Sequence, residues 1–116
     1  MNNKSVFVDY WGKCQYTGEV NSRDQPHGLG TAVEEDGWRY EGTYQDNSLV
    51  TGKRFGPDGF LAYEGEFKGR RYHGTGTEFY RDGTVATGRW EEGSLIDGTY
   101  TFPDGEVVKY VNGKEV

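Results

Sequence analysis

The chain of 116 residues is long enough for one domain, but only 33% of its residues are hydrophobic and 19 are glycine. This composition excludes a large aliphatic core, while the 16% of aromatic residues speaks against the disorder expected of a charged, glycine-rich chain. The formal net charge of -6 argues against nucleic acid or an anionic bilayer as the main partner, because both favour an excess of Lys and Arg.

The chain alternates predicted strands with turns from one end to the other. Outgoing strands are predicted at 5–10, 29–35, 52–56, 75–80 and 99–102, and returning strands at 13–20, 39–45, 61–68, 84–91 and 106–111. Most outgoing strands end at an Asp-Gly turn, as at Asp58-Gly59, where Asp bonds its own backbone and Gly takes a positive φ. Looser loops join the hairpins. The pattern predicts five hairpins, about ten strands and no substantial helix.

An aromatic–glycine–aromatic triple recurs along these strands with a period of about 23 residues. The clearest copy is Tyr63, Gly65 and Phe67, and the related copies begin at Tyr40 and, in decayed form, at Tyr16 and Ala86. Alternate residues of a strand point to one face, so each triple places its rings together. The repetition predicts one hairpin unit stacked on copies of itself.

The glycines within these strands need a compensating gain, because each weakens a strand by roughly 0.5 to 1 kcal/mol relative to Ala. A large ring can lie over a glycine of the neighbouring strand, where no Cβ intrudes, and bury about 150 to 250 Å². The sequence therefore predicts a row of rings along the inside of a strongly curved sheet.

The single cysteine, Cys14, can form no internal disulfide and fits a reducing compartment. The beginning of the chain has no long apolar run followed by a small-residue cleavage site, and no stretch reaches 18 consecutive apolar residues. These features predict a soluble, cytoplasmic protein, unless the chain is part of a larger one.

Residues 63–76 resemble a membrane occupation and recognition nexus (MORN) repeat, which runs Tyr-x-Gly-x-aromatic-x-x-Gly-x-x-x-Gly-x-Gly. The other copies depart from it, with Val20 at an aromatic place, Arg54 at the second Gly of Gly-x-Gly, and Ala86 and Tyr100 in the last full copy. The resemblance covers residues 12–113. It implies an elongated, twisted, single-layer antiparallel sheet of stacked hairpins that serves as a protein-binding or dimerising scaffold.

The repeat divides the chain into units of approximately 5–28, 29–51, 52–74, 75–97 and a capping unit at 98–116, all within one domain at 1–116. Two readings of the aromatic row remain open: the rings form the core, or part of the row stays exposed as a groove for a peptide, a helix or a second subunit. On the second reading the partner-binding residues are Tyr40, Tyr44, Tyr63, Phe67, Arg70, Arg71, Tyr72 and Trp90. Tyr72→Ala together with Arg71→Glu should then weaken association and leave the fold intact.

A basic cluster in the middle third of the chain offers an alternative function. If its members share one surface, anionic lipid headgroups would gain about 1 kcal/mol per basic residue. The competing reading is a solvated loop edge. The cluster consists of Lys53, Arg54, Arg70, Arg71 and Arg81.

Two histidines, His27 and His73, stand directly before a repeat glycine, where the other copies have Thr51 and Asp97. Two His without a nucleophile or a third ligand make neither a hydrolase site nor a zinc site. We therefore expect no catalytic residues, no metal and no cofactor.

Overall fold

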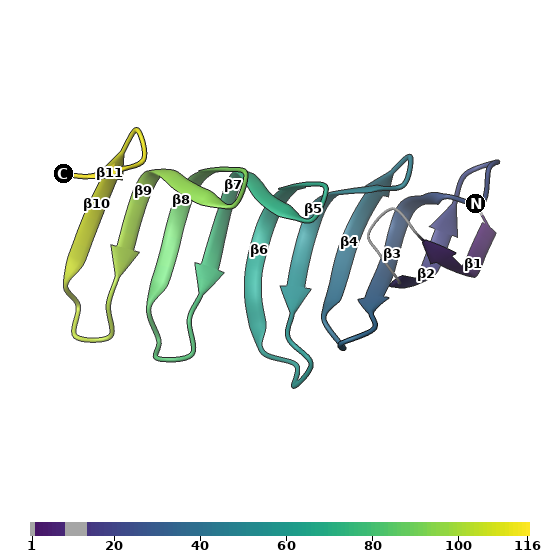
Figure 1. Ribbon diagram of the computed structural model, residues 1–116, viewed down its shortest axis with the longest axis horizontal. Helices are drawn as coiled ribbons and strands as arrows, with labels where there is room; N and C mark the ends of the chain where they lie inside the picture. The colour runs from purple at the N-terminus through teal and green to yellow at the C-terminus, as the bar shows by residue number, and fades with distance from the viewer. Residues whose placement is uncertain (1, 9–13) are drawn as a thin grey trace.

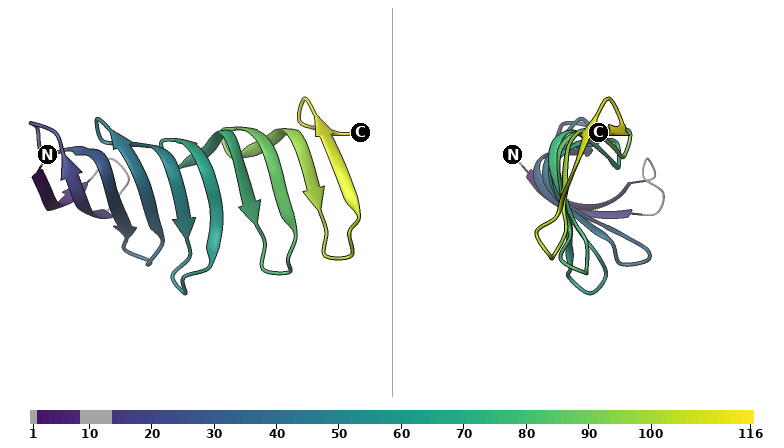
Figure 2. Two further views of the ribbon diagram at one scale, coloured as in Figure 1. Left: turned by 180° about the vertical axis from the view of Figure 1, so that it is seen from behind. Right: turned by 90° about the vertical axis from the view of Figure 1, so that its left-hand side faces the viewer.

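The computed structural model describes residues 2–8 and 14–116, which form one antiparallel sheet of eleven strands (Figure 1). Each strand pairs with the next along the chain, so the predicted all-β meander is confirmed. The sheet measures 47 × 28 × 22 Å, and its end view shows a strong curl (Figure 2). The strands are β1 Asn2–Val8, β2 Cys14–Val20, β3 Pro26–Glu34, β4 Arg39–Gln45, β5 Ser48–Phe55, β6 Leu61–Lys68, β7 Arg71–Phe79, β8 Val85–Glu91, β9 Ser94–Thr101, β10 Val107–Val111 and β11 Lys114–Glu115.

The Asp-Gly turns follow the predicted chemistry. In each, the Asp side chain accepts a hydrogen bond from the backbone N–H two residues later, as in Thr84 N–H to Asp82 Oδ1 at 2.8 Å. The following glycines have φ between 89° and 97°. The part of the first hairpin at residues 9–13 lies outside the described residues.

The other ends of the hairpins differ from the sequence prediction. Strands β5, β7 and β9 begin four to five residues earlier than expected, because tight two-residue turns replace the predicted looser loops. At Asp46 and Asn47 both residues have positive φ, 45° and 76°, as a type I′ turn requires. A further short strand, β11, follows β10, which was expected to close the sheet.

A row of glycines crosses the sheet from β2 to β9, with each glycine paired to the next one across the strands. Its members are Gly18, Gly30, Gly42, Gly52, Gly65, Gly76, Gly88 and Gly98. A Cβ added at Gly52 would lie 2.1 Å from the Glu41 carbonyl oxygen. In the glycine row, Gly52 is therefore the equivalent of Gly30 and Gly76. The prediction that Arg54 stands at this position of the repeat was wrong, because Arg54 pairs with Tyr40 and Gly52 pairs with Gly42.

The predicted stacking of rings on glycines is confirmed on the buried face. A Cβ at Gly30 would meet the Tyr16 hydroxyl at 2.1 Å, and one at Gly76 would meet the Tyr63 hydroxyl at 1.9 Å. Each phenol donates to a backbone carbonyl, Tyr63 to Glu66 at 2.8 Å. A ring thus fills the space that glycine leaves, while its polar end stays hydrogen-bonded.

The core is a single layer of side chains on the inner face of the sheet. At its centre Tyr63 stacks on Tyr72 with ring centroids 3.9 Å apart and an angle of 5°, while Phe67 and Trp90 meet Tyr63 edge-on. The described core residues are Cys14, Tyr16, Val20, Ala32, Tyr40, Tyr44, Leu49, Tyr63, Phe67, Tyr72, Ala86, Trp90 and Leu95.

The glycine row predicts a sharp difference between two alanine variants. Gly52→Ala places a Cβ against hydrogen-bonded backbone and should lower the free energy of unfolding by about 3 kcal/mol or more. In Gly59→Ala the new Cβ meets no atom within 4 Å, and the only strain comes from the positive φ of this residue. This variant should therefore lower the free energy of unfolding by about 1 kcal/mol. Urea denaturation measures both, and equal losses would contradict the role assigned to the row.

Cys14 provides a second check on the core. Its side chain is fully buried, and this burial raises the pKa of the thiol to about 11. Only the thiolate reacts, so alkylation by iodoacetamide at pH 8 should be slow in the folded protein and fast in denaturant. Mass spectrometry of both reactions measures the difference, and fast labelling of the folded protein would contradict the burial.

Candidate functional site

The six aromatic residues proposed for partner binding all lie in the core. Tyr40, Tyr44, Tyr63, Phe67, Tyr72 and Trp90 are each at most 9% exposed. The expectation that part of the row stays open is not met at these rings, because the curl of the sheet folds the two ends of the strands toward each other over them. Arg70 and Arg71 lie exposed at the β6–β7 turn. Arg70 pairs with Glu34, whose carboxylate also accepts a hydrogen bond from the Tyr40 hydroxyl at 3.2 Å.

Tyr72 in particular has a structural role. Its ring stacks on Tyr63, and its hydroxyl accepts a hydrogen bond from the Arg54 guanidinium at 3.2 Å. The expectation that a substitution here leaves the fold intact is therefore wrong on packing grounds.

The structure does not gather the basic cluster on one open surface. Arg70 pairs with Glu34, Arg71 with Glu92 and Arg81 with Asp58, at 2.7 to 2.8 Å. Arg54 is half-buried on the inner face, and Lys53, its neighbour in β5, points to the opposite face. Lipid binding through these residues stays a prediction, but the geometry spreads their charge and pairs most of it.

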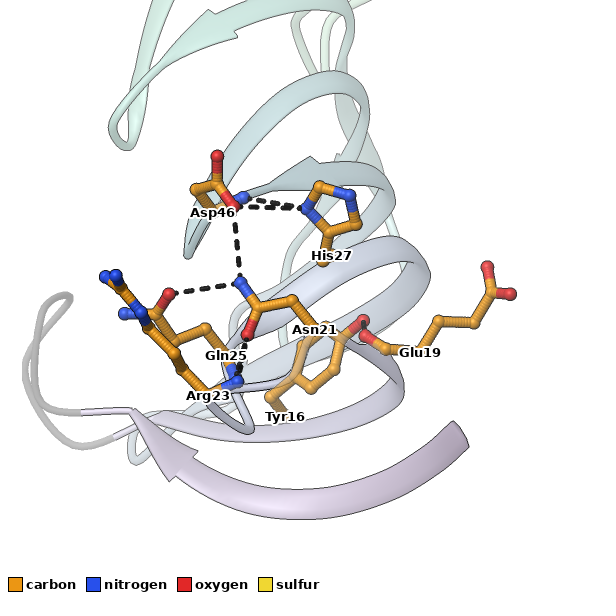
Figure 3. A network of polar contacts seen from close by, with 7 residues as sticks. All are labelled: Tyr16, Glu19, Asn21, Arg23, Gln25, His27 and Asp46. Carbon is orange, nitrogen blue, oxygen red and sulfur yellow. Dashed lines mark hydrogen bonds and ion pairs between the residues drawn. The ribbon is translucent and has the colours of Figure 1, made fainter. Parts of the chain in front are cut away.

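His27 and His73 hold turns in place. The Nδ1 atom of His27 accepts the Asp46 N–H at 3.1 Å, and that of His73 accepts the Glu92 N–H at 3.3 Å. Figure 3 shows His27 in a network in which Asn21 also donates to Asp46. Within the described residues, no group of three or more His, Cys, Asp or Glu side chains is arranged to hold a metal.

The inner face opens at its C-terminal end into a pocket of about 370 Å³. Aromatic rings supply much of its wall, and the stacked core reaches it through Tyr100 and Tyr110, which pack against the core cluster. Two carboxylates, one threonine and one valine complete it. The lining residues are Tyr80, Asp82, Thr84, Tyr100, Phe102, Val108, Tyr110 and Glu115.

The pocket exists because the repeat changes. Thr84 stands 46 residues after Trp38, and both occupy the same turn position: each N–H bonds to an Asp two residues earlier, and each carbonyl accepts from the strand before. Likewise Ala86 pairs with Tyr100 as Tyr40 pairs with Arg54. Two large rings of the first half are thus replaced by two small side chains, which leaves the space open.

The polar groups of the pocket have distinct states. Hydrogen bonds from Thr84 lower the pKa of Asp82, so this carboxylate is charged at neutral pH. The pKa of the Tyr80 phenol is raised mainly by burial and also by the neighbouring Glu78. The phenol donates a hydrogen bond to the Glu78 carboxylate at 2.6 Å. Thr84 is 5% exposed, and its hydroxyl oxygen is buried beside the Asp82 carboxylate.

Sequence reasoning missed this pocket. The sequence shows Tyr100 as a departure from the repeat, but this departure did not point to a site. The signal that could have found it is the pair of small residues, Thr84 and Ala86, at positions where the copy two units earlier has Trp38 and Tyr40.

Comparison of the chain with protein-family models and with curated proteins finds no match. Membership of the MORN family stays a prediction from the residues. No helix within residues 2–8 and 14–116 is long and apolar enough to cross a bilayer.

The aromatic stack predicts unequal effects of two tyrosine truncations. Tyr72→Ala removes a buried ring and should lower the free energy of unfolding by about 3 to 5 kcal/mol. Tyr110→Ala trims a half-buried ring at the rim of the pocket and should cost at least about 2 kcal/mol less. Chemical denaturation compares them, and similar losses would show that Tyr72 is no more a core residue than Tyr110.

Proposed function

We propose that this chain is a non-enzymatic scaffold that binds another protein at the C-terminal end of its sheet. The observation that carries the proposal is the open aromatic pocket beside β10 and β11. Tyrosine is among the residues that most often dominate interface energies, because it offers a large rigid surface with one polar end. The volume of about 370 Å³ suits a side chain or a short segment of a partner.

The buried rings of the central units support this end of the sheet. Tyr100 lies between Tyr80 and Tyr110, with ring centroids 6.3 and 5.2 Å away. Because these rings pack on one another and on the core, they lose little conformational freedom when a partner binds. The central aromatic residues therefore contribute to binding by holding the pocket rigid rather than by touching the partner.

The edge of the sheet lies beside the pocket. β11 is the last strand in the sheet order, so no described strand pairs with its outer edge. An extended segment of a partner could add to such an edge through main-chain hydrogen bonds while one of its side chains enters the pocket. The partner can be a different protein or a second copy of this chain.

Photo-crosslinking tests the proposed site directly. p-Benzoylphenylalanine replaces Phe102, which lines the pocket, or Phe79, whose neighbour in the chain, Tyr80, lines it. Phe79 points to the opposite face of the sheet and is therefore a matched control. We expect the Phe102 probe to capture a defined protein in native cell extract, and the Phe79 probe not to capture it.

Capture of the same proteins from both positions, or from neither, would contradict this function. A captured mass of twice the chain would identify the partner as a second copy. In the captured complex, peptide mapping should place the crosslink on one segment of the partner.

A further inference from the structure

The first half of the sheet holds a cation beside the two rings, Trp38 and Tyr40, that fill the space corresponding to the pocket. The guanidinium of Arg54 lies 3.8 Å from the centre of the Trp38 ring. It also donates to the hydroxyls of Tyr40 and Tyr72, at 3.1 and 3.2 Å. The inner face of this protein thus accommodates a guanidinium group between an aromatic face and phenol oxygens.

The second half has Thr84 and Ala86 in place of Trp38 and Tyr40, and other rings line its pocket: Tyr80, Tyr100, Phe102 and Tyr110. Tyr100 occupies the place of Arg54 in the strand register, and its ring stands at 61° to that of Tyr110. The faces of such rings carry negative electrostatic potential, which attracts a cation placed above them.

The charge of the pocket, like its rings, favours a cation. Its lining includes two carboxylates, Asp82 and Glu115, and no Lys, Arg or His. Arg81, next to Asp82 in the chain, forms its ion pair with Asp58 instead, at 2.8 Å. The pocket therefore presents negative charge beside an apolar wall.

Thr84 places one of these carboxylates at the pocket. Its backbone N–H donates to Asp82 Oδ1 at 2.8 Å, and its buried hydroxyl also lies near the Asp82 carboxylate. Asp82 is thereby held where a cation in the pocket can pair with it.

We propose that the C-terminal pocket binds an arginine side chain of the protein partner, an inference that rests on the proposed scaffold function. A guanidinium group is planar, is weakly hydrated, stacks on rings and carries five N–H donors for the two carboxylates. Lysine brings a strongly hydrated point charge that suits the rings less well.

The binding test uses the peptide acetyl-Gly-Gly-Arg-Gly-Gly-amide and its citrulline and lysine counterparts, titrated into the full chain and followed by NMR. Citrulline keeps the shape of arginine without the charge. We expect the arginine peptide to bind with perturbed signals around Tyr100, the lysine peptide more weakly, and the citrulline peptide at least about tenfold more weakly. Equal binding of arginine and citrulline peptides, or no binding of the arginine peptide at millimolar concentration, would overturn the inference.

Two variants locate the site. Asp82→Asn with Glu115→Gln removes both charges, while Asn can still accept the Thr84 N–H, so affinity for the arginine peptide should fall at least about tenfold. Asp36→Asn is the matched control, because Asp36 has the same turn role in the first half and does not line the pocket. An equal loss in this control, or no loss in the double variant, would contradict the assignment.

A third variant, Thr84→Trp, rebuilds the ring of Trp38 in the second half and should abolish peptide binding by filling the space. If it does not fold, as judged by its NMR spectrum, the carboxylate double variant carries the test. A Phe102 crosslink to a partner without arginine-peptide binding would overturn the arginine inference and keep the scaffold function. Arginine-peptide binding without any crosslinked partner would keep the arginine inference and overturn the scaffold function.

Discussion

The close approach of backbone along the glycine row is the constraint on which the structure depends. From β2 to β9, glycines pair with glycines, and a Cβ at Gly42 or Gly98 would lie 2.1 Å from a carbonyl oxygen. The sheet can curl this tightly only where side chains are absent. Because it curls, a single layer of strands covers its own inner face, where most proteins need a second layer.

This constraint also explains how a chain with few aliphatic residues folds. The curl leaves a narrow space, and flat rings fill it with their polar ends at backbone carbonyls: Tyr44 donates to Tyr40, and the Trp90 indole donates to Gly76 at 3.0 Å. Aliphatic side chains of similar volume would leave those buried carbonyls without these donors. Glycine and aromatic residues are therefore two parts of one packing solution.

Local chemistry made the strands and Asp-Gly turns predictable from the sequence, because alternation and turn residues act over a few positions. The alignment of all the glycines was not predictable, since it depends on register shifts such as that between Thr43 and Tyr44. The burial of Tyr40 and Tyr63 was not decided either, because alternation shows which residues share a face and not how far the sheet curls. The pocket was missed for a related reason: it is defined by small residues, Thr84 and Ala86, which give no positive signal.

In an array of repeats, each unit completes its core with side chains of the next unit. β11 is only two residues long, so the last described unit has little to offer, and the rings of Tyr100 and Tyr110 remain half-buried. Filling this end internally would require large residues such as Trp38 and Tyr40 at the equivalent positions, and the chain has Thr84 and Ala86 there instead. The small residues Thr84 and Ala86 lie next to the charged carboxylates of the pocket. Core packing is therefore lost at a place where the side chain of a ligand can supply it instead. The departure of Thr84 and Ala86 from the repeat is therefore a stronger indication of function than the repeat itself.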